Sequence, residues 1–141
     1  MIGAIIAKRA AANAFRALSQ HDLAGFMSAW REDGVLIYPG EMYASGTYTG
    51  KPAVEQWCRK FFEQYPKIQF NVQQICVKDI FALTGTNVLA VHWNISLTNR
   101  TGRLGENSGV SVISLKGGKV IQVKDFIFDL GENFRLNWGA S

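Results

Sequence analysis

The sequence has few cysteines and histidines, the residues on which disulfide-bonded and zinc-binding folds depend. Two of its 141 residues are cysteines and two are histidines, with no Cys-x-x-Cys pair and no metal-ligand spacing. Cys58 falls in a helical apolar pattern and Cys76 in a strand-like one. Such positions favour small buried side chains in a reducing compartment over a redox pair. We therefore expect neither a disulfide framework nor a metal site.

Long hydrophobic runs and dense charge clusters are also missing. No apolar run approaches the ~20 residues of a membrane-spanning helix. The apolar residues 1–7 precede their charges, Lys8 and Arg9, which is the reverse of the order in a signal peptide. The net charge is only +4 and the basic residues are scattered, whereas proteins that read nucleic acids cluster them on one stripe. We expect a cytoplasmic protein that binds neither membranes nor nucleic acids.

The composition is that of a folded domain. Hydrophobic residues make up 48% of the sequence and charged residues 18%, whereas disordered chains are polar and highly charged. The length suits one hydrophobic core. We place a single domain over residues 1–141, because no repeat, linker or low-complexity segment divides the chain.

Three segments in the first half of the chain have helical spacing. Residues 4–18 are rich in alanine, and Asp22 is a good N-cap for a second helix that ends at Asp33-Gly34. The apolar face of that second helix includes Trp30. The third helix begins with Pro52 at its first position and has the strongest pattern, formed by Val54, Trp57, Cys58, Phe61, Phe62 and Tyr65.

The second half of the chain alternates with a period of two, which is typical of strands. Short turns separate these strands, so neighbours are expected to be antiparallel. The tail 131–141 is apolar enough to pack on the domain. We expect a loop over residues 41–49 and strands over residues 35–38, 68–80, 88–98, 108–115 and 119–129.

Helices followed by an antiparallel meander indicate an α+β fold, with the helices packed on one face of a curved antiparallel sheet. A sheet wrapped over a long helix leaves a cone that encloses a pocket. The architecture therefore predicts a small-molecule site inside the cone.

Three segments also resemble a known family. They are 23–40, with Tyr38-Pro39-Gly40 at its end, 46–54 at the entrance to the third helix, and Gly117-Gly118-Lys119-Val120-Ile121 before Phe126-Ile127-Phe128-Asp129. Their order over residues 10–130 is similar to the nuclear-transport-factor-2-like superfamily, with its SnoaL-like and ketosteroid-isomerase-like branches. The resemblance implies a cone-shaped α+β barrel and a homodimer formed through the outer sheet face. It implies isomerases, dehydratases or cyclases, and equally non-catalytic binding domains.

The residues of ketosteroid isomerases are not matched. Those enzymes have an aspartate before the proline where this chain has Tyr38 before Pro39. Their first-helix tyrosine corresponds to Ala14 and Phe15, and their strand aspartate to Ser108. These differences argue against steroid isomerisation by that mechanism.

SnoaL-like cyclases place an acid/base aspartate on the last strand, and here Asp125 lies between Val123 and Ile127 on one strand face. Desolvation on that face would raise its pKa toward neutrality, where it can take and give a proton. The alternatives are a carboxylate paired with lysine or solvent, or one at a dimer interface. By alternation His92 faces outward, but a register error of one residue would exchange the two faces.

We predict a small enzyme without a cofactor that moves a proton on a hydrophobic carbonyl or hydroxyl compound. Asp125 would move the proton and Tyr38 would orient the substrate oxygen. The alternative is a non-catalytic small-ligand-binding or dimeric accessory domain of the same fold, in which the aromatic residues are simply core. The predicted substrate-binding residues are Trp30, Tyr48, Trp57, Phe61, Val91, Trp93, Val110, Val123 and Ile127.

Overall fold

The protein is described here by a computed structural model, in which residues 1–139 are placed. The last part of the expected single domain, residues 140–141, lies outside the described residues. The helices are α1 (Ile2–Ser19), α2 (Leu23–Ser28), α3 (Lys51–Gln64) and α4 (Glu132–Asn137). The strands are β1 (Trp30–Tyr38), β2 (Gly46–Thr49), β3 (Lys67–Val77), β4 (Asn87–Thr98), β5 (Leu104–Lys116) and β6 (Lys119–Ile127).

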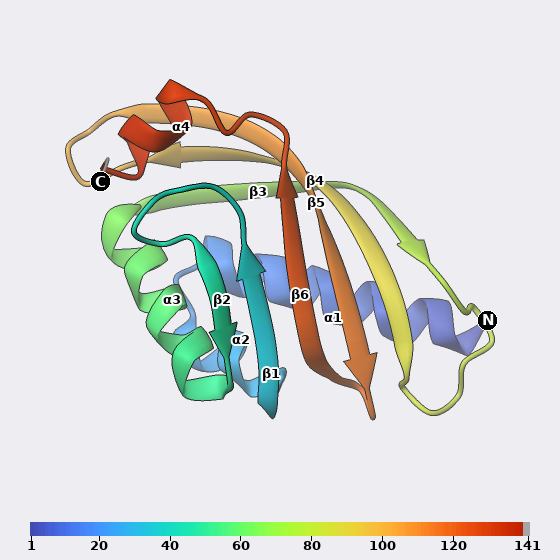
Figure 1. The fold of residues 1–141 in the computed structure, drawn as a ribbon. Coiled ribbons are helices and arrows are strands. Elements are labelled where there is room, and N and C mark those ends of the chain that lie inside the picture. The colour runs from blue at the N-terminus through green and yellow to red at the C-terminus, as the bar shows by residue number, and fades with distance from the viewer. Residues whose placement is uncertain (140–141) are drawn as a thin grey trace.

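The strands form one six-stranded sheet in the order β2-β1-β6-β5-β4-β3. Its long strands bend over α1 and α3, which cover one face, while β2 and β3 remain open edges (Figure 1). The α+β class and the cone-shaped arrangement are confirmed. The sheet is mixed, because β1 and β6 run parallel whereas the other neighbours are antiparallel. Short turns predict only sequential neighbours, so they gave no sign of this pair.

The second helix is shorter than the sequence pattern predicted. Asp22 is its N-cap as expected, and its Oδ1 accepts a hydrogen bond from the Gly25 backbone N–H at 2.9 Å. The helix ends at Ser28, however, and Trp30 is the first residue of β1. Trp30 pairs with Val120 of β6, so a long-range strand pairing overrides the helical spacing. The side chain is buried, as an apolar helical position would have been.

Part of the predicted loop 41–49 is also regular. Residues Gly46–Thr49 form β2, an edge strand that pairs with the end of β1. Its glycine and threonines gave no alternating apolar signal, because all but one of its residues are exposed. The other expected helices and strands lie where the sequence predicted them, with shifts of up to five residues at their ends. Helix α4 was not predicted, since the sequence indicated only that the apolar tail packs on the domain.

The core lies between the concave face of the sheet and the helices. Cys58 is buried in it, whereas Cys76 is exposed, which corrects the expectation that both are buried. The apolar tail packs as predicted, since Trp138 is 1% exposed. No helix among residues 1–139 is long and apolar enough to cross a membrane.

Candidate functional site

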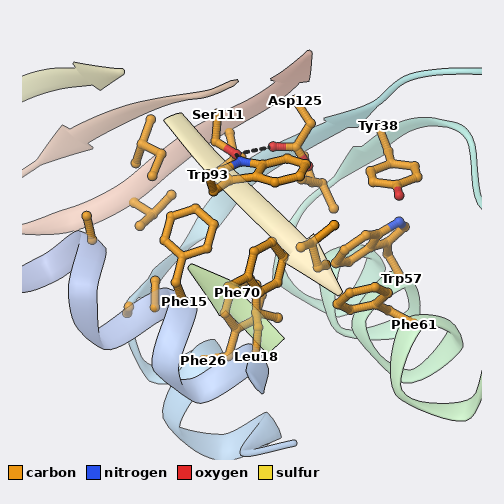
Figure 2. Close-up of a pocket in the computed structure, with 18 of the residues that line it drawn as sticks. Phe15, Leu18, Phe26, Tyr38, Trp57, Phe61, Phe70, Trp93, Ser111 and Asp125 are labelled. Atoms are coloured by element: carbon orange, nitrogen blue, oxygen red, sulfur yellow. Dashed lines mark hydrogen bonds between the residues drawn. The ribbon is translucent and has the colours of Figure 1, made fainter. Parts of the chain in front are cut away.

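A cavity of about 90 Å³ lies inside the cone, between α1, α3 and the concave sheet face. Figure 2 shows aromatic rings around it from both sides, with Phe15 and Phe70 facing Trp57 and Phe61. Its lining is almost wholly apolar. Asp125 is the one carboxylate that lines it in the described part of the chain.

Asp125 is held in the cavity wall by a chain of hydrogen bonds across three strands. It lies opposite Ser111 of β5, and the Ser111 hydroxyl donates to Asp125 Oδ1 at 2.6 Å. The Trp93 indole N–H donates to the Ser111 hydroxyl oxygen at 2.9 Å. Because Ser111 accepts from Trp93, its own proton is left for the carboxylate (Figure 2).

A glycine allows Trp93 to reach across β5. Gly109 lies opposite Trp93, and a Cβ added there would lie 2.7 Å from the Trp93 ring. Such a contact is too short for a real side chain, so the ring can lie over the strand only at a glycine. This close approach places the indole nitrogen beside Ser111.

The surroundings of Asp125 shift its titration toward neutral pH. Part of the residue is solvent-accessible, but its carboxyl group lies among apolar side chains of the cavity. Burial raises the pKa of Asp125 to about 6, and the hydrogen bond from Ser111 lowers it in part. Near neutral pH the group can therefore exist in either protonation state, as a general acid or base requires.

We expect Ser111→Ala to raise the pKa of Asp125 further, because the variant loses the one hydrogen bond that favours the charged carboxylate. A carbon-13 NMR titration of the carboxyl groups measures the shift, with Asp125→Asn assigning the signal. Ser108→Ala is the matched control, since the Ser108 hydroxyl donates instead to Asn94 Oδ1 at 2.6 Å. An unchanged Asp125 titration in Ser111→Ala would contradict the geometry.

The same carboxyl group should make stability depend on pH. The raised pKa means that the folded state keeps the proton between about pH 4 and pH 6 while the unfolded chain loses it. The free energy of unfolding therefore falls as pH rises through this window, by on the order of 3 kcal/mol. We expect Asp125→Asn to lack that fall, so that it gains stability relative to the wild type between pH 4 and pH 7.

Urea unfolding at a series of pH values measures this difference. Asp33→Asn is the control, because it removes a carboxylate whose side chain is 77% exposed. A constant stability difference between Asp125→Asn and the wild type from pH 4 to pH 7 would show that Asp125 is not desolvated.

Tyr38, at the end of β1, supplies a hydroxyl group to the same cavity. The residue is 8% exposed, and its hydroxyl oxygen accepts a hydrogen bond from the Trp138 indole N–H at 3.1 Å. Burial, followed by the nearby Asp125 charge, raises the pKa of Tyr38 well above its ordinary value. The phenol stays protonated at neutral pH and can act as a hydrogen-bond donor.

The structure gathers most of the predicted site residues around the cavity. Asp125 and Tyr38 both line it, and they do so from adjacent strands. Val91 is fully buried on the same sheet face but does not reach the cavity surface. The predicted substrate-binding residues that do line it are Trp30, Trp57, Phe61, Trp93, Val123 and Ile127.

Two predicted residues lie elsewhere. Val110 is on the outer sheet face, since it is opposite His92 and adjacent to the inward-facing Ser111. Tyr48 is on β2 outside the cavity, where its hydroxyl donates to the Ala44 carbonyl at 2.9 Å. The outward position predicted for His92 agrees with this register.

Sequence reasoning missed Ser111 and Trp138 as residues of the site. The pairing of Ser111 with Asp125 depends on the register between β5 and β6, which no single strand reveals. The apolar tail predicted that Trp138 packs, but its contact with Tyr38 spans 100 residues of sequence. No cluster of metal-binding side chains occurs within residues 1–139.

Comparisons with known proteins identify the family and the fold. The family model of the SnoaL-like domain matches residues 11–123, while a comparison with curated proteins finds no match. One similar solved structure is an NTF2-like protein from Burkholderia pseudomallei, with 20% identity, a TM-score of 0.76, and coverage of 93% of this chain and 96% of that chain.

Two further structures are similar in fold. A Bacillus subtilis protein described as a candidate isomerase has 18% identity and a TM-score of 0.78, with coverage of 100% of this chain and 98% of that chain. TerC, co-crystallised with polyporic acid, has 13% identity and a TM-score of 0.76, with coverage of 96% and 99%. At these identities the likeness concerns the fold alone. Together with the match over residues 11–123, the cone-shaped fold places this chain in the SnoaL-like family.

Proposed function

We propose that the protein is a cofactor-independent enzyme that transfers a proton on a small hydrophobic carbonyl or hydroxyl compound, as an isomerase, cyclase or dehydratase. The observation that carries this proposal is the carboxyl group of Asp125 inside an apolar cavity, with its pKa raised to about 6. Perturbed carboxyl groups in cavities are typical of general acid/base catalysts.

Asp125 and Tyr38 have complementary roles in this proposal. Asp125 in its charged form takes a proton from the substrate and returns it at a second position. Tyr38, held by Trp138, donates a hydrogen bond to the substrate oxygen. Since that oxygen gains negative charge as the proton leaves, the hydrogen bond from Tyr38 strengthens in the transition state.

Two structural relatives are consistent with this class of ligand and reaction. The Bacillus subtilis protein is described as a candidate isomerase, and TerC was co-crystallised with polyporic acid. These descriptions concern those proteins. They support the proposal because the present chain combines the same fold with an apolar cavity.

The alternative is a binding or accessory domain without catalysis. It is favoured by the lack of a second acid/base carboxylate, since Asp125 is the one carboxylate of the described residues that lines the cavity. With either function a two-ring ligand has to displace lining side chains, because the cavity of about 90 Å³ is smaller than the engineered 150 Å³ cavity that accommodates benzene. A binding domain of this kind would hold a small hydrophobic molecule and leave it unchanged.

We also propose a cytoplasmic homodimer formed through the outer sheet face. Phe126 and Phe128 of this face are 46% and 64% exposed, and they lie on or just after β6. Apolar side chains on the solvent side of a sheet are typical of an interface. Sedimentation of the protein as a monomer at micromolar concentration would contradict this arrangement.

Deuterium exchange tests the proposed reaction. In heavy water, 2-indanone exchanges the hydrogens beside its carbonyl group, and proton NMR follows the loss of their signal. We expect the protein to accelerate this exchange in the wild type and much less in Asp125→Asn. Binding of 2-indanone without acceleration would favour the non-catalytic alternative.

A further inference from the structure

The indole N–H of Trp57 is a buried donor that no group within residues 1–139 satisfies. Trp57 is 4% exposed and lines the cavity from α3. Its Nε1 atom has no hydrogen-bond partner within residues 1–139. A buried N–H without a partner destabilises the fold, and an acceptor supplied from outside the chain would remove that cost.

A second donor lies beside Trp57. Figure 2 shows the Trp57 indole nitrogen and the Tyr38 hydroxyl turned toward one another, and the two ring centres are 5.0 Å apart. The Tyr38 oxygen already accepts from the Trp138 indole, which can only donate. The hydroxyl proton of Tyr38 is therefore directed elsewhere, and none of the described residues accepts it.

None of the nearby acceptors is paired with these two donors, although the Tyr65 hydroxyl, which also lines the cavity, and the Gln64 Oε1 and Asn137 Oδ1 atoms are buried without a partner within residues 1–139. The Asp125 carboxylate accepts from Ser111 on the sheet side. Trp93 and Trp138 differ from Trp57 because their indole N–H groups donate to Ser111 and Tyr38. The Trp57 N–H and the Tyr38 O–H are thus neighbouring donors on the α3 side of the cavity, and no described residue accepts a hydrogen bond from either.

We propose that the Trp57 N–H and the Tyr38 O–H together bind the oxygen of an uncharged, flat carbonyl compound, with its reactive hydrogens directed toward Asp125. The inference rests on the proposed function, because it assumes that the substrate binds in this cavity. It adds Trp57 as a residue that determines specificity, and it narrows the substrate class from carbonyl or hydroxyl compounds to ketones and related carbonyl compounds.

The charge and the shape of the cavity lining favour an uncharged, flat carbonyl compound as the ligand. No lysine, arginine or histidine of residues 1–139 lines the cavity, so a buried carboxylate ligand would lack a cation and would face the Asp125 charge. A cation would leave both donors unsatisfied. The stacked pair of Trp57 and Phe61, with ring centres 5.1 Å apart, favours a flat ligand packed along aromatic faces.

A matched pair of probes tests the donor site. 2-Indanone is a flat ketone, and indane is a hydrocarbon of nearly the same shape that lacks the oxygen. Nitrogen-15-labelled protein gives one indole signal for each of its four tryptophans, and the Trp57 signal is assigned from Trp57→Phe or from its contacts with Phe61. We expect saturation with 2-indanone to move the Trp57 indole proton downfield, and indane not to do so.

Binding constants give the second measurement. The ratio of the indane Kd to the 2-indanone Kd should fall about tenfold in Trp57→Phe, because one hydrogen bond to the ketone is lost. Trp30→Phe is the matched control, since it removes another indole from the same cavity wall and should leave the ratio unchanged. Comparing ratios cancels the general loss of apolar contact in each variant.

The outcomes separate this inference from the proposed function. A Trp57 signal that does not move downfield, an equal ratio in all three proteins, or no binding of 2-indanone would overturn the inference. Asp125→Asn should retain the downfield shift while losing exchange activity. If the wild type shows the shift without exchange, the donor site stands and the catalytic proposal fails.

Discussion

Replacing Asp125 by asparagine is expected to lower the protein-catalysed deuterium exchange of 2-indanone by about 10²–10⁴-fold, the usual contribution of a general base. Asparagine has nearly the same shape and can still accept the hydrogen bond from Ser111, but it cannot take a proton. The variant therefore tests the charge of the group and leaves the cavity in place. Proton NMR in heavy water measures the exchange rate against that of buffer alone.

The pH dependence provides an internal check on the same prediction. The base must be charged to act, so the exchange rate should rise with pH and reach half its maximum near the pKa of Asp125, which is about 6. Ser111→Ala should move this midpoint upward, because the Ser111 hydrogen bond lowers the pKa. A higher pH midpoint of the exchange rate in Ser111→Ala would show that the activity depends on the Asp125 carboxyl group.

Asp129→Asn is the matched control for the loss of activity. Asp129 follows β6, is exposed, and accepts a hydrogen bond from the Gly131 backbone N–H at 2.8 Å. Its replacement removes a nearby carboxylate without changing the cavity lining. Equal exchange rates in Asp125→Asn and the wild type would contradict the proposed mechanism, since no other carboxylate of the described residues lines the cavity.

The sequence predicted the position of Asp125 because the signal on β6 is local. Val123, Asp125 and Ile127 alternate along one strand, so they share a face whatever the strand pairs with. The superfamily resemblance then indicated which face is concave. Both steps needed only neighbouring residues and a fold that many sequences share.

For Val110, alternation along the strand did not predict the correct face of the sheet. Strand β5 carries valines at 110 and 112 on one face, and Ser111 and Ile113 on the other. Apolar residues occur on both faces, so alternation alone does not say which one is concave. The register with β6 decides it by pairing Ser111 with Asp125. That pairing also creates the hydrogen bond that lowers the pKa of Asp125. The register between β5 and β6 therefore determines both the concave face of β5 and the pKa of the carboxyl group.

For Trp30, the spacing of apolar residues predicted the wrong secondary structure. Its spacing from Phe26 is that of a helical face, and both rings are buried, with centres 5.9 Å apart. A burial pattern is satisfied equally by a longer helix and by a turn into β1. The pairing of Trp30 with Val120 determines that Trp30 lies in a strand, and it joins residues 90 positions apart. The local spacing of apolar residues carries no information about such a distant contact.

Trp138→Ala is expected to destabilise the protein by about 3–5 kcal/mol, as for other large aromatic side chains removed from a core. Trp138 is 1% exposed and packs against four aromatic rings: Tyr38, Tyr43, Phe61 and Tyr65. Its indole N–H also holds the Tyr38 hydroxyl. The C-terminal segment should therefore be part of the cooperative fold, and urea unfolding measures the change.

Two further variants separate packing from hydrogen bonding. Trp138→Phe keeps a ring but loses the N–H, so we expect a smaller loss of stability and a freed Tyr38 hydroxyl. Leu136→Ala, on helix α4 just before Trp138 and 41% exposed, should change stability little. If Trp138→Ala were no more destabilising than Leu136→Ala, the tail would not hold Tyr38. The donor end of the cavity would then have to be ordered by Trp57 and its neighbours on α3 alone.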